Sequence, residues 1–495
     1  MMISFDLVDR PWIPVTVGGE SESVGLRELF VRAAEFDDLV LPVPPAASGL
    51  WRILYAITAR VTGLDALRGD RWRQRQEQVL DRGGFVADDV DAYFEEYRGR
   101  FDLFDSQRPW MQDPRLAAEC PKSSGVNKLV FDRPAGNTQV WFGHHTDAAP
   151  AAPAALAPGE AAWYLIAQLY YGASGRCSSR EVAGQKFANS NAGPLRGTMS
   201  YHPLGENLFE SLVVGVPPEV SVQDEGPDLC PWERDELPNP LDVPSVSGRC
   251  GALTGRARHA VLLVPDAVGE AVTGAYVTWA WRLAGPEVRD PYVVHRQNKD
   301  GGWYQLPADG SRALWRDVEA LLGGAGEIKT RRPDIMATAA DLELDGRVRA
   351  YGFDQDGQAK DRQWFTAVTP PILGWLRERD PAIAHGVAGL TRAAESSGRR
   401  VGAVLRQVWR ETVNAKDREG PWARTAEAIY WSEAEAVFWE HVRDRRFSDG
   451  SKAFAHLAHD AIDRAAGDVS APRLVRAVQT AHRLLSTPSK KGAAT

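Results

Sequence analysis

The chain of 495 residues has little cysteine, no long apolar run and no excess of positive charge. Its four cysteines, Cys120, Cys177, Cys230 and Cys250, include no C-x-x-C pair, so the sequence predicts neither a disulfide framework nor a zinc ribbon. The most apolar region, residues 151–171, is interrupted by two prolines and a glutamate, which excludes a membrane span. Because the first ten residues also lack an apolar secretory core, we expect a cytoplasmic protein.

The charge balance also excludes one class of function. Lysine and arginine number 58 against 66 acidic residues, which gives a net charge of −8. A protein that binds nucleic acid alone and without specificity is normally basic. Local basic patches are still compatible with this composition, because net charge reports on solubility and steering rather than on individual sites.

Common catalytic motifs are missing. The Gly-Ala-Ser-Gly segment at 172–175 has the wrong spacing for a nucleophile elbow, and there is no phosphate-binding P-loop. His144, His145 and Asp147 are candidate metal ligands, but no further His or Cys at ligand spacing accompanies them. We therefore expect no catalytic residue, no metal and no cofactor. A metal-dependent hydrolase that uses His144, His145 and Asp147 is the alternative.

Periodicity predicts an α+β fold with two parts. A large mixed α/β domain with long loops is expected over residues 1–369, and a C-terminal four-helix bundle over residues 370–495. Strands are predicted at 208–216, 260–264 and 348–353. Helices are predicted at 23–35, 47–61, 71–97, 159–173 and 311–322, with loops at 113–157 and 184–197. In the bundle, apolar stripes lie at 401–409, 429–438 and 474–485, and a first helix is expected near 372–379 or 384–395.

Three polar segments are candidates for binding. Residues 186–197 combine small residues, asparagines and flanking positive charge, which suits close approach to a DNA minor groove. Residues 357–362 place a glutamine on a glycine-preceded turn, where an inserted side chain can unstack a base step. Arginines are densest on the helix predicted around residues 392–410. Physical chemistry alone favours two ordinary turns and a solvated helix face.

Five segments, in order along the chain, resemble a single family. Residues 5–15, read alone, predict an edge strand with a buried Trp12, because two prolines remove backbone donors. They resemble the opening of CasA, the large subunit of the type I-E CRISPR surveillance complex called Cascade. Residues 108–112 are similar to the family's His-Pro-Phe-Met-Gln connector, and 124–134 to its mobile RNA-contacting loop. Residues 193–197 and 357–359 are similar to its Gly-Leu-Arg-Gly stretch and its Asn-Gln-Ala wedge.

The resemblance implies a non-catalytic DNA-recognition subunit that reads the short PAM beside the target and opens the duplex there. The implied partners are other Cascade subunits, crRNA, double-stranded target DNA with a PAM, and a helicase-nuclease, with no membrane involved. The implied PAM-reading residues are Phe187, Ala188, Asn189, Ser190, Asn191, Ala192 and Arg282. The implied wedge is Gly357, Gln358 and Lys360. The implied crRNA 5′-end contacts are Asn127, Lys128, Val130, Phe131 and Arg133. The implied non-target-strand contacts are Arg392, Arg399, Arg400, Arg406 and Arg410.

The sequence departs from the family pattern at four points. Residues 188–192 are not glycine-rich, and the PAM-reading lysine of the family falls near Trp279, with Arg282 the nearest basic residue. Gly357 stands where the family has asparagine, and the two C-x-x-C pairs of some members are missing, so we predict no zinc. If the implied mechanism holds, segments 184–197 and 354–363 must lie on one face of the protein.

Overall fold

The computed structural model describes residues 3–133, 154–220, 226–323, 329–355, 360–413, 416–417 and 419–487. Backbone contacts divide the chain into two compact units. Unit 1 comprises Met1–Ser311 and Thr330–Gly374, and unit 2 comprises Arg312–Lys329 and Trp375–Thr495. The domain boundary predicted between residues 369 and 370 stays a prediction about independent folding.

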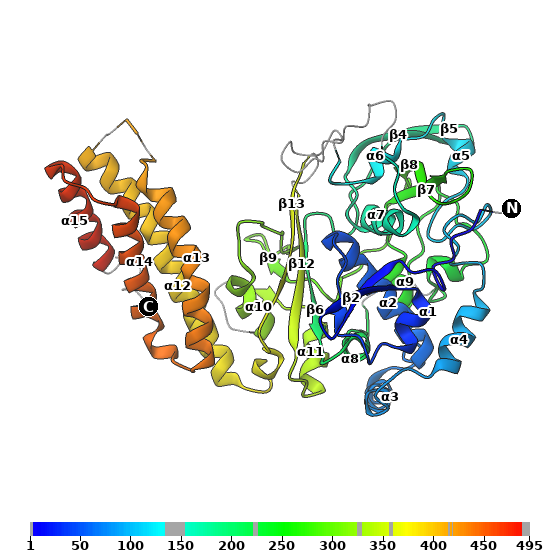
Figure 1. Cartoon of the computed structure of the whole chain (residues 1–495), viewed down its shortest axis with the longest axis horizontal. Coiled ribbons are helices and arrows are strands. Elements are labelled where there is room, and N and C mark those ends of the chain that lie inside the picture. The colour runs from blue at the N-terminus through cyan, green and yellow to red at the C-terminus, as the bar shows by residue number, and fades with distance from the viewer. Residues whose placement is uncertain are drawn as a thin grey trace. The chain divides into compact units, whose positions relative to one another are not determined.

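Unit 1 is a mixed α and β structure with small antiparallel sheets (Figure 1). Its helices are α1 Leu26–Val31, α2 Pro44–Thr62, α3 Gly69–Asp81, α4 Ala87–Glu96, α5 Leu116–Glu119, α6 Val126–Leu129, α7 Pro158–Tyr171, α8 Leu208–Val214, η1 Pro231–Glu233, α9 Gly248–Thr254 and α11 Ile335–Asp341. Its strands are β1 Ile13–Val17, β2 Glu20–Val24, β3 Asp38–Leu39, β4 Gly175–Val182, β5 Gln185–Ser190, β6 Met199–Leu204, β7 His259–Pro265, β8 Val272–Trp279, β9 His295–Gln297, β10 Trp303–Gln305, β11 Thr330–Arg331, β12 Arg347–Gln355 and β13 Asp361–Val368.

These strands form five sheets among the described residues, with orders β2-β1-β3, β10-β9-β11, β13-β12-β6, β4-β5 and β7-β8. Helix α2 lies in the core, and every one of its residues except Arg60 is buried. It begins with two prolines, which are tolerated in the first helical turn, and ends at Gly63 in the left-handed conformation (φ 68°).

A charged network crosses the core beside α2. The fully buried Arg52 donates two hydrogen bonds to Asp290, at 3.0 and 2.8 Å, and Arg256 pairs with the same carboxylate. Burial raises the pKa of Asp290, but the two guanidinium groups lower it by more, so the carboxylate is ionised. Tyr292 lies under Arg52, whose guanidinium carbon is 5.0 Å from the ring centroid.

The structure confirms the α+β class and corrects several predicted elements. Residues 208–216 were predicted as a strand, whereas the structure has helix α8, capped by the side chain of Asn207 accepting from Glu210 N at 3.0 Å. Because nearly all residues of this segment are buried, its short apolar pattern does not separate strand from helix. The helix predicted at 71–97 is two helices, α3 and α4, and the one predicted at 23–35 is strand β2 followed by α1.

The opening segment differs in one respect from its prediction. Trp12 is buried, as expected, but β1 is the central strand of its sheet rather than an edge. The sheet tolerates Pro14 because β3 is only two residues long and Pro14 lies just past its end. There the Pro14 carbonyl accepts a hydrogen bond from Val40 N at 3.0 Å. No residue of β3 lies opposite Pro14, so none needs the N–H that proline lacks.

Unit 2 packs four helices together: α12 Pro381–Val408, α13 Trp422–Arg443, α14 Gly450–Ala466 and α15 Pro472–Ser486. Its shorter helical segments are η2 Leu314–Asp317, α10 Val318–Leu322, the π-helical η4 Trp409–Val413 and η5 Phe447–Asp449, and η3 Leu373–Trp375 spans the boundary between the two units. The two segments predicted separately at 384–395 and 401–409 are one 28-residue helix, and α14 was not predicted. No helix within the described parts of the chain is both long and apolar enough to cross a membrane.

We expect Asp290→Asn to destabilise the protein by about 3–5 kcal/mol, because it leaves two buried guanidinium groups without their counter-charge. The midpoint of urea denaturation measures the effect. Asp91→Asn is the matched control, since Asp91 pairs with Arg27 on an exposed surface where ion pairs contribute little. Equal midpoints for the two variants would contradict a special role for the core network.

Candidate nucleic-acid interface

The predicted PAM-reading segment is largely a strand rather than a loop. Residues 185–190 form β5, which pairs with β4 in an antiparallel hairpin that turns at Ala183 and Gly184, both with positive φ (49° and 73°). Periodicity missed this strand because both of its faces carry polar residues, so no apolar alternation marks it. Asn189 and Asn191 are exposed, whereas Ala188 and Ala192 are half-buried and Ser190 is buried.

The hairpin rests on an aromatic and cationic stack. The Arg282 guanidinium carbon lies 3.7 Å from the Phe187 ring centroid, and the Phe187 and Trp279 rings meet edge to face at 5.9 Å. The buried Trp279 indole donates a hydrogen bond to the Phe187 carbonyl at 3.1 Å. The structure therefore brings Phe187 and Arg282 together, as the resemblance implied, and uses Trp279 as their support.

A buried histidine fixes the end of β5. His259 Nε2 donates to the Ala173 carbonyl at 2.9 Å and lies 3.2 Å from Ser190 Oγ. Its Nδ1 has no hydrogen-bond partner among the described residues and faces Gly172, where a Cβ would lie 2.5 Å away. Burial lowers the pKa of His259 to about 4, so the imidazole is neutral at pH 7.

The second candidate segment is the tip of a long hairpin. Strands β12 and β13 run side by side from Arg349↔Val368 to Gln355↔Asp361 (Figure 1). The implied wedge residues Gly357 and Gln358 lie outside the described residues, and Lys360 is exposed directly before β13. The hairpin was predicted only in part, as the strand at 348–353.

The bases of the two candidate segments are joined. Gln355 accepts a hydrogen bond from Gly197 N at 3.0 Å through its side-chain oxygen, and its amide nitrogen donates to Asp361 at 2.6 Å. Arg196 pairs with the same Asp361 carboxylate at 3.1 Å. Burial raises the pKa of Asp361, and the Arg196 charge opposes that rise. The end of segment 184–197 and the base of the wedge hairpin thus lie in direct contact.

The predicted crRNA segment divides into surface and core residues. Asn127 and Lys128 lie half-buried on α6, and Arg133 donates to the Ala154 carbonyl. Val130 and Phe131 are buried, with the Phe131 ring 5.5 Å from that of Phe353 on β12. Their side chains lie in the core, so the predicted contact of these two residues with the crRNA stays a prediction that their side-chain burial does not support.

Comparison with known proteins identifies the family. The family model described as CRISPR-associated protein Cse1 matches residues 6–469. The chain belongs to the Cse1 (CasA) family. A CasA/Cse1 protein of Thermus thermophilus is 29% identical over 426 residues, which is 84% of this chain and 80% of the relative.

Solved structures agree with this assignment. A chain of a CRISPR RNA-guided surveillance complex is 41% identical and matches with a TM-score of 0.85 over 98% of this chain and 100% of that one. Thermus thermophilus CasA is 22% identical, with a TM-score of 0.75 over 98% and 99% of the two chains, and shows the same fold.

In this Cse1-family chain, the arginines predicted to contact the non-target strand have different partners. Arg400 donates to the carbonyls of Leu484, Leu485 and Thr487 at 2.6–3.0 Å and so caps the end of α15. Arg406 pairs with Glu419 and Glu427 at 3.1 and 2.9 Å. Both side chains therefore have partners within unit 2, and their contact with the non-target strand stays a prediction.

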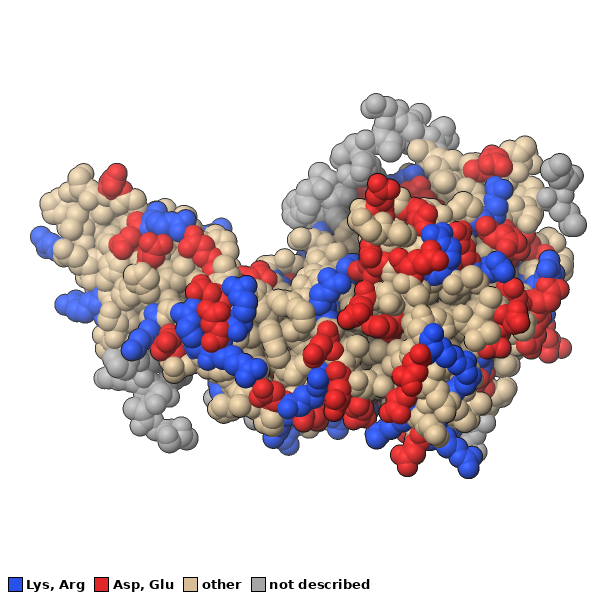
Figure 2. All heavy atoms as spheres, turned by 60° about the horizontal axis from the view of Figure 1, so that its bottom comes forward, with Lys and Arg blue, Asp and Glu red and all other residues tan. Residues whose placement is uncertain are grey.

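The remaining arginines of α12 and η4 are better placed for a ligand. Arg399 is 72% exposed and only 3.5 Å from Glu395, while Arg392 and Arg410 are exposed and have no ion-pair partner in the described parts of the chain. On the face seen in Figure 2, basic and acidic side chains lie interspersed. Arg392, Arg399 and Arg410 are thus the most exposed of the five predicted arginines.

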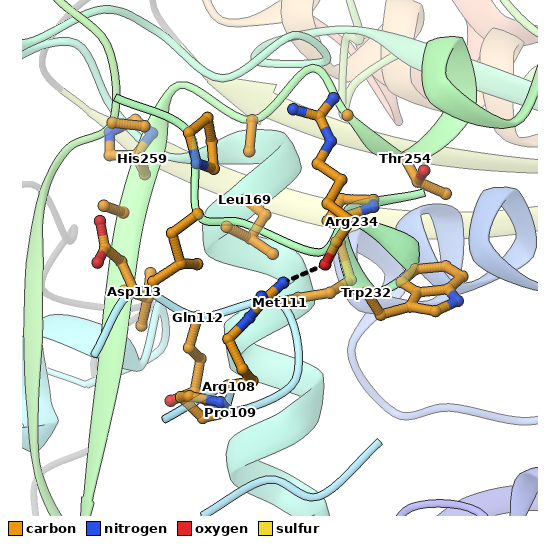
Figure 3. Close-up of a pocket in the computed structure, with 18 of the residues that line it drawn as sticks. Arg108, Pro109, Met111, Gln112, Asp113, Leu169, Trp232, Arg234, Thr254 and His259 are labelled. Atoms are coloured by element: carbon orange, nitrogen blue, oxygen red, sulfur yellow. Dashed lines mark hydrogen bonds between the residues drawn. The ribbon is translucent and has the colours of Figure 1, made fainter. Parts of the chain in front are cut away.

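The Arg108–Gln112 connector lines a cavity of about 140 Å³ in unit 1 (Figure 3). Arg108 donates to the backbone carbonyls of Arg234 and Asp235, and the side-chain amide of Gln112 donates to the Leu103 carbonyl at 2.8 Å. Asp113, also on the wall, is paired with Arg115 and Arg180 at 2.8 and 2.7 Å. Arg108, Gln112 and Asp113 thus tie the connector to neighbouring segments of the chain, which gives the connector a structural role.

The alternative hydrolase site falls outside the described residues, since His144, His145 and Asp147 all do. Within the described ranges, no group of three His, Cys, Asp or Glu side chains is placed to hold a metal ion.

Sequence reasoning missed the residues that join the two segments. Gln355 and Asp361 flank the predicted wedge turn, but a glutamine and an aspartate beside a polar turn give no signal of burial. Arg196 was noted only as part of the Gly-Leu-Arg-Gly stretch. The one signal for this contact in the sequence was Gly197, which has a φ of 69°, a conformation that favours glycine.

We expect the neutral His259 to make unit 1 sensitive to acid. The unfolded chain binds a proton near pH 6.5 and the folded chain only near pH 4, so the unfolded state binds more protons between these values. Stability therefore falls as the pH is lowered through this window, by roughly 3 kcal/mol from this group. Urea midpoints at several pH values measure it, and His259→Gln, which keeps the Ala173 hydrogen bond, should flatten the profile. Parallel profiles for the two proteins would contradict the assignment.

Proposed function

We propose that this chain is the DNA-recognition subunit of a type I-E CRISPR surveillance complex, with binding rather than catalysis as its role. The observation that carries the proposal is the contact between Gly197 and Gln355, reinforced by the Arg196–Asp361 pair. It ties the segment proposed to read the PAM to the hairpin proposed to open the duplex beside it. Such a subunit acts in the cytoplasm, together with guide RNA and target DNA.

PAM reading is proposed for the β5 hairpin. Exposed Asn189 and Asn191 offer amide donors and acceptors that suit the edges of bases in the minor groove. Ala188 and Ala192 are small, so the backbone can approach the groove closely. The Arg282 guanidinium, stacked on Phe187 beside this strand, supplies positive charge toward the phosphates.

Duplex opening is proposed for the tip of the β12–β13 hairpin. Inserting a side chain into a base step costs a few kcal/mol of stacking, so the inserting element must be held rigidly. The hairpin meets this need at its base, where Gln355 and Asp361 are buried and bonded to each other and to segment 196–197. Gln358 is the proposed inserting residue, with Gly357 before it and Lys360 beside the phosphates.

Three further contacts complete the proposal. Asn127, Lys128 and Arg133 are proposed to contact the crRNA 5′ end. Arg392, Arg399 and Arg410 are proposed to contact the displaced strand, in place of the larger set predicted from sequence. Other subunits of the complex and a helicase-nuclease are the proposed protein partners. The relative in the surveillance complex, at 41% identity over nearly all of both chains, supports this assignment.

Gln358→Ala should slow opening of a linear PAM-bearing target by the assembled complex at least about tenfold, because the inserted side chain no longer offsets the unstacking cost. Stopped-flow fluorescence of a base analogue next to the PAM measures opening. Gln78→Ala, an exposed glutamine on α3, is the control and should leave the rate unchanged. Unchanged opening by Gln358→Ala would refute the wedge.

Replacing both Asn189 and Asn191 by alanine should change which PAM is tolerated, by about 1–3 kcal/mol for the base pair that each amide reads. Competition binding against a library of flanking sequences gives the preference directly. An equal loss of affinity for every flanking sequence would contradict base reading and would indicate backbone contact instead.

A further inference from the structure

The small sheet β10-β9-β11 exposes an aromatic and cationic face that the proposed function does not use. On this sheet Trp303 pairs with Gln297, and Arg331 pairs with His295. Because alternate residues of a strand face the same side, Trp303, Gln297, His295 and Arg331 share one face. Tyr304, which follows Trp303 directly, lies on the other face with its cross-strand partner Arg296.

Trp303 and Arg331 form a stacked pair at the surface. The Arg331 guanidinium carbon is 3.9 Å from the Trp303 ring centroid, and Trp303 is 37% exposed. Indole and guanidinium planes are the two protein surfaces on which unpaired bases stack most readily. A tryptophan held in place by a cation on an exposed strand therefore offers a base a platform that is already ordered.

The surrounding charge fits a polyanion. Segments 295–305 and 330–332 contain four cations and one acid, a local reversal of the chain's net charge of −8. The cations are Arg296, Lys299, Arg331 and Arg332, and the acid is Asp300. Of these, Arg331 lies on the Trp303 face, Lys299 is exposed in the turn between β9 and β10, and Arg296 lies on the opposite face. An exposed aromatic ring beside cations is typical of single-strand binding.

The face also lies next to the proposed wedge. Directly after β10, Pro307 bridges to Thr198, and Ala308 N donates to the Gly197 carbonyl at 2.9 Å. Two residues further on, Gly310 N donates to the Asp354 side chain at 3.2 Å, at the base of the β12–β13 hairpin. The segment that follows β10 therefore contacts the base of the hairpin proposed to open the duplex.

We propose that the Trp303–Arg331 face of the β10-β9-β11 sheet binds an unpaired nucleic-acid strand. A base stacks on the Trp303–Arg331 pair, and neighbouring phosphates contact Lys299 and Arg331. Which strand of a target occupies the face rests on the proposed function, but the binding itself does not.

The test uses the purified full chain and a fluorescently labelled dT12 oligonucleotide, followed by anisotropy over a range of salt concentrations. Trp303→Ala should weaken binding roughly 5- to 100-fold, because stacking contributes about 1–3 kcal/mol per base, and should leave the salt dependence unchanged. Trp303→Phe should restore most of the affinity. Arg331→Ala and Lys299→Ala should each weaken binding and reduce the slope of log Kd against log salt by about 0.7.

Tyr304→Ala is the matched control, since Tyr304 is 45% exposed on the same strand but on the opposite face. It should bind dT12 as the unmodified chain does. The inference is overturned if the unmodified chain does not bind dT12, if Trp303→Ala binds normally, or if Tyr304→Ala loses as much affinity. Equal losses by Trp303→Ala on dT12 and on a blunt 12-bp duplex would assign the face to duplex DNA and also overturn it. The assay contains no PAM and no guide RNA, so its failure is distinct from failure of the proposed wedge.

Discussion

The position of the candidate interface depends on one buried charge arrangement, two guanidinium groups on the single carboxylate of Asp290. A buried ion pair contributes little net stability compared with an apolar core, but losing one partner is costly, so it enforces one arrangement of the segments it joins. Here it joins helix α2, through Arg52, to the segment that carries Tyr292. The backbone of Tyr292 then accepts a hydrogen bond from Tyr201 N at 2.8 Å, which places strand β6.

Strand β6 in turn positions the hairpin that carries the proposed wedge. Strand β6 pairs with β12 from Leu204↔Arg347 to Met199↔Gly352, and β12 continues past this pairing into the hairpin with β13. Just before β6 begins, Gly197 and Arg196 are the partners of Gln355 and Asp361. Hydrogen bonds thus connect the core to the base of the hairpin. The packed core would therefore hold the hairpin in place during the proposed insertion into a base step.

Sequence reasoning succeeded where burial imposes a period and failed where it does not. Buried and more exposed residues alternate at the start of the strand around Val348, and in the helix around Leu50 large apolar residues recur at helical spacing although nearly every residue is buried; both elements were predicted. Strand β5 has polar residues on both faces, and helix α8 is buried over nearly its whole length, so neither carries a diagnostic period. The segments of the candidate interface were found because they resemble family motifs that occur in the same order. The contact between Gln355 and Gly197 is a tertiary contact, which no local sequence pattern predicts.

The arginines of α12 show why charge density is a weak guide to binding. A run of arginines in an acidic protein finds carboxylates and helix ends within the same molecule first, as Arg406 and Arg400 do. Each such contact reduces the charge available to a phosphate. A cation is more informative when a neutral aromatic ring rather than an acid holds it, because its charge is then not neutralised. By this criterion, Arg282 on Phe187 and Arg331 on Trp303 are stronger candidates for contact with nucleic acid than the arginines of the densest basic run.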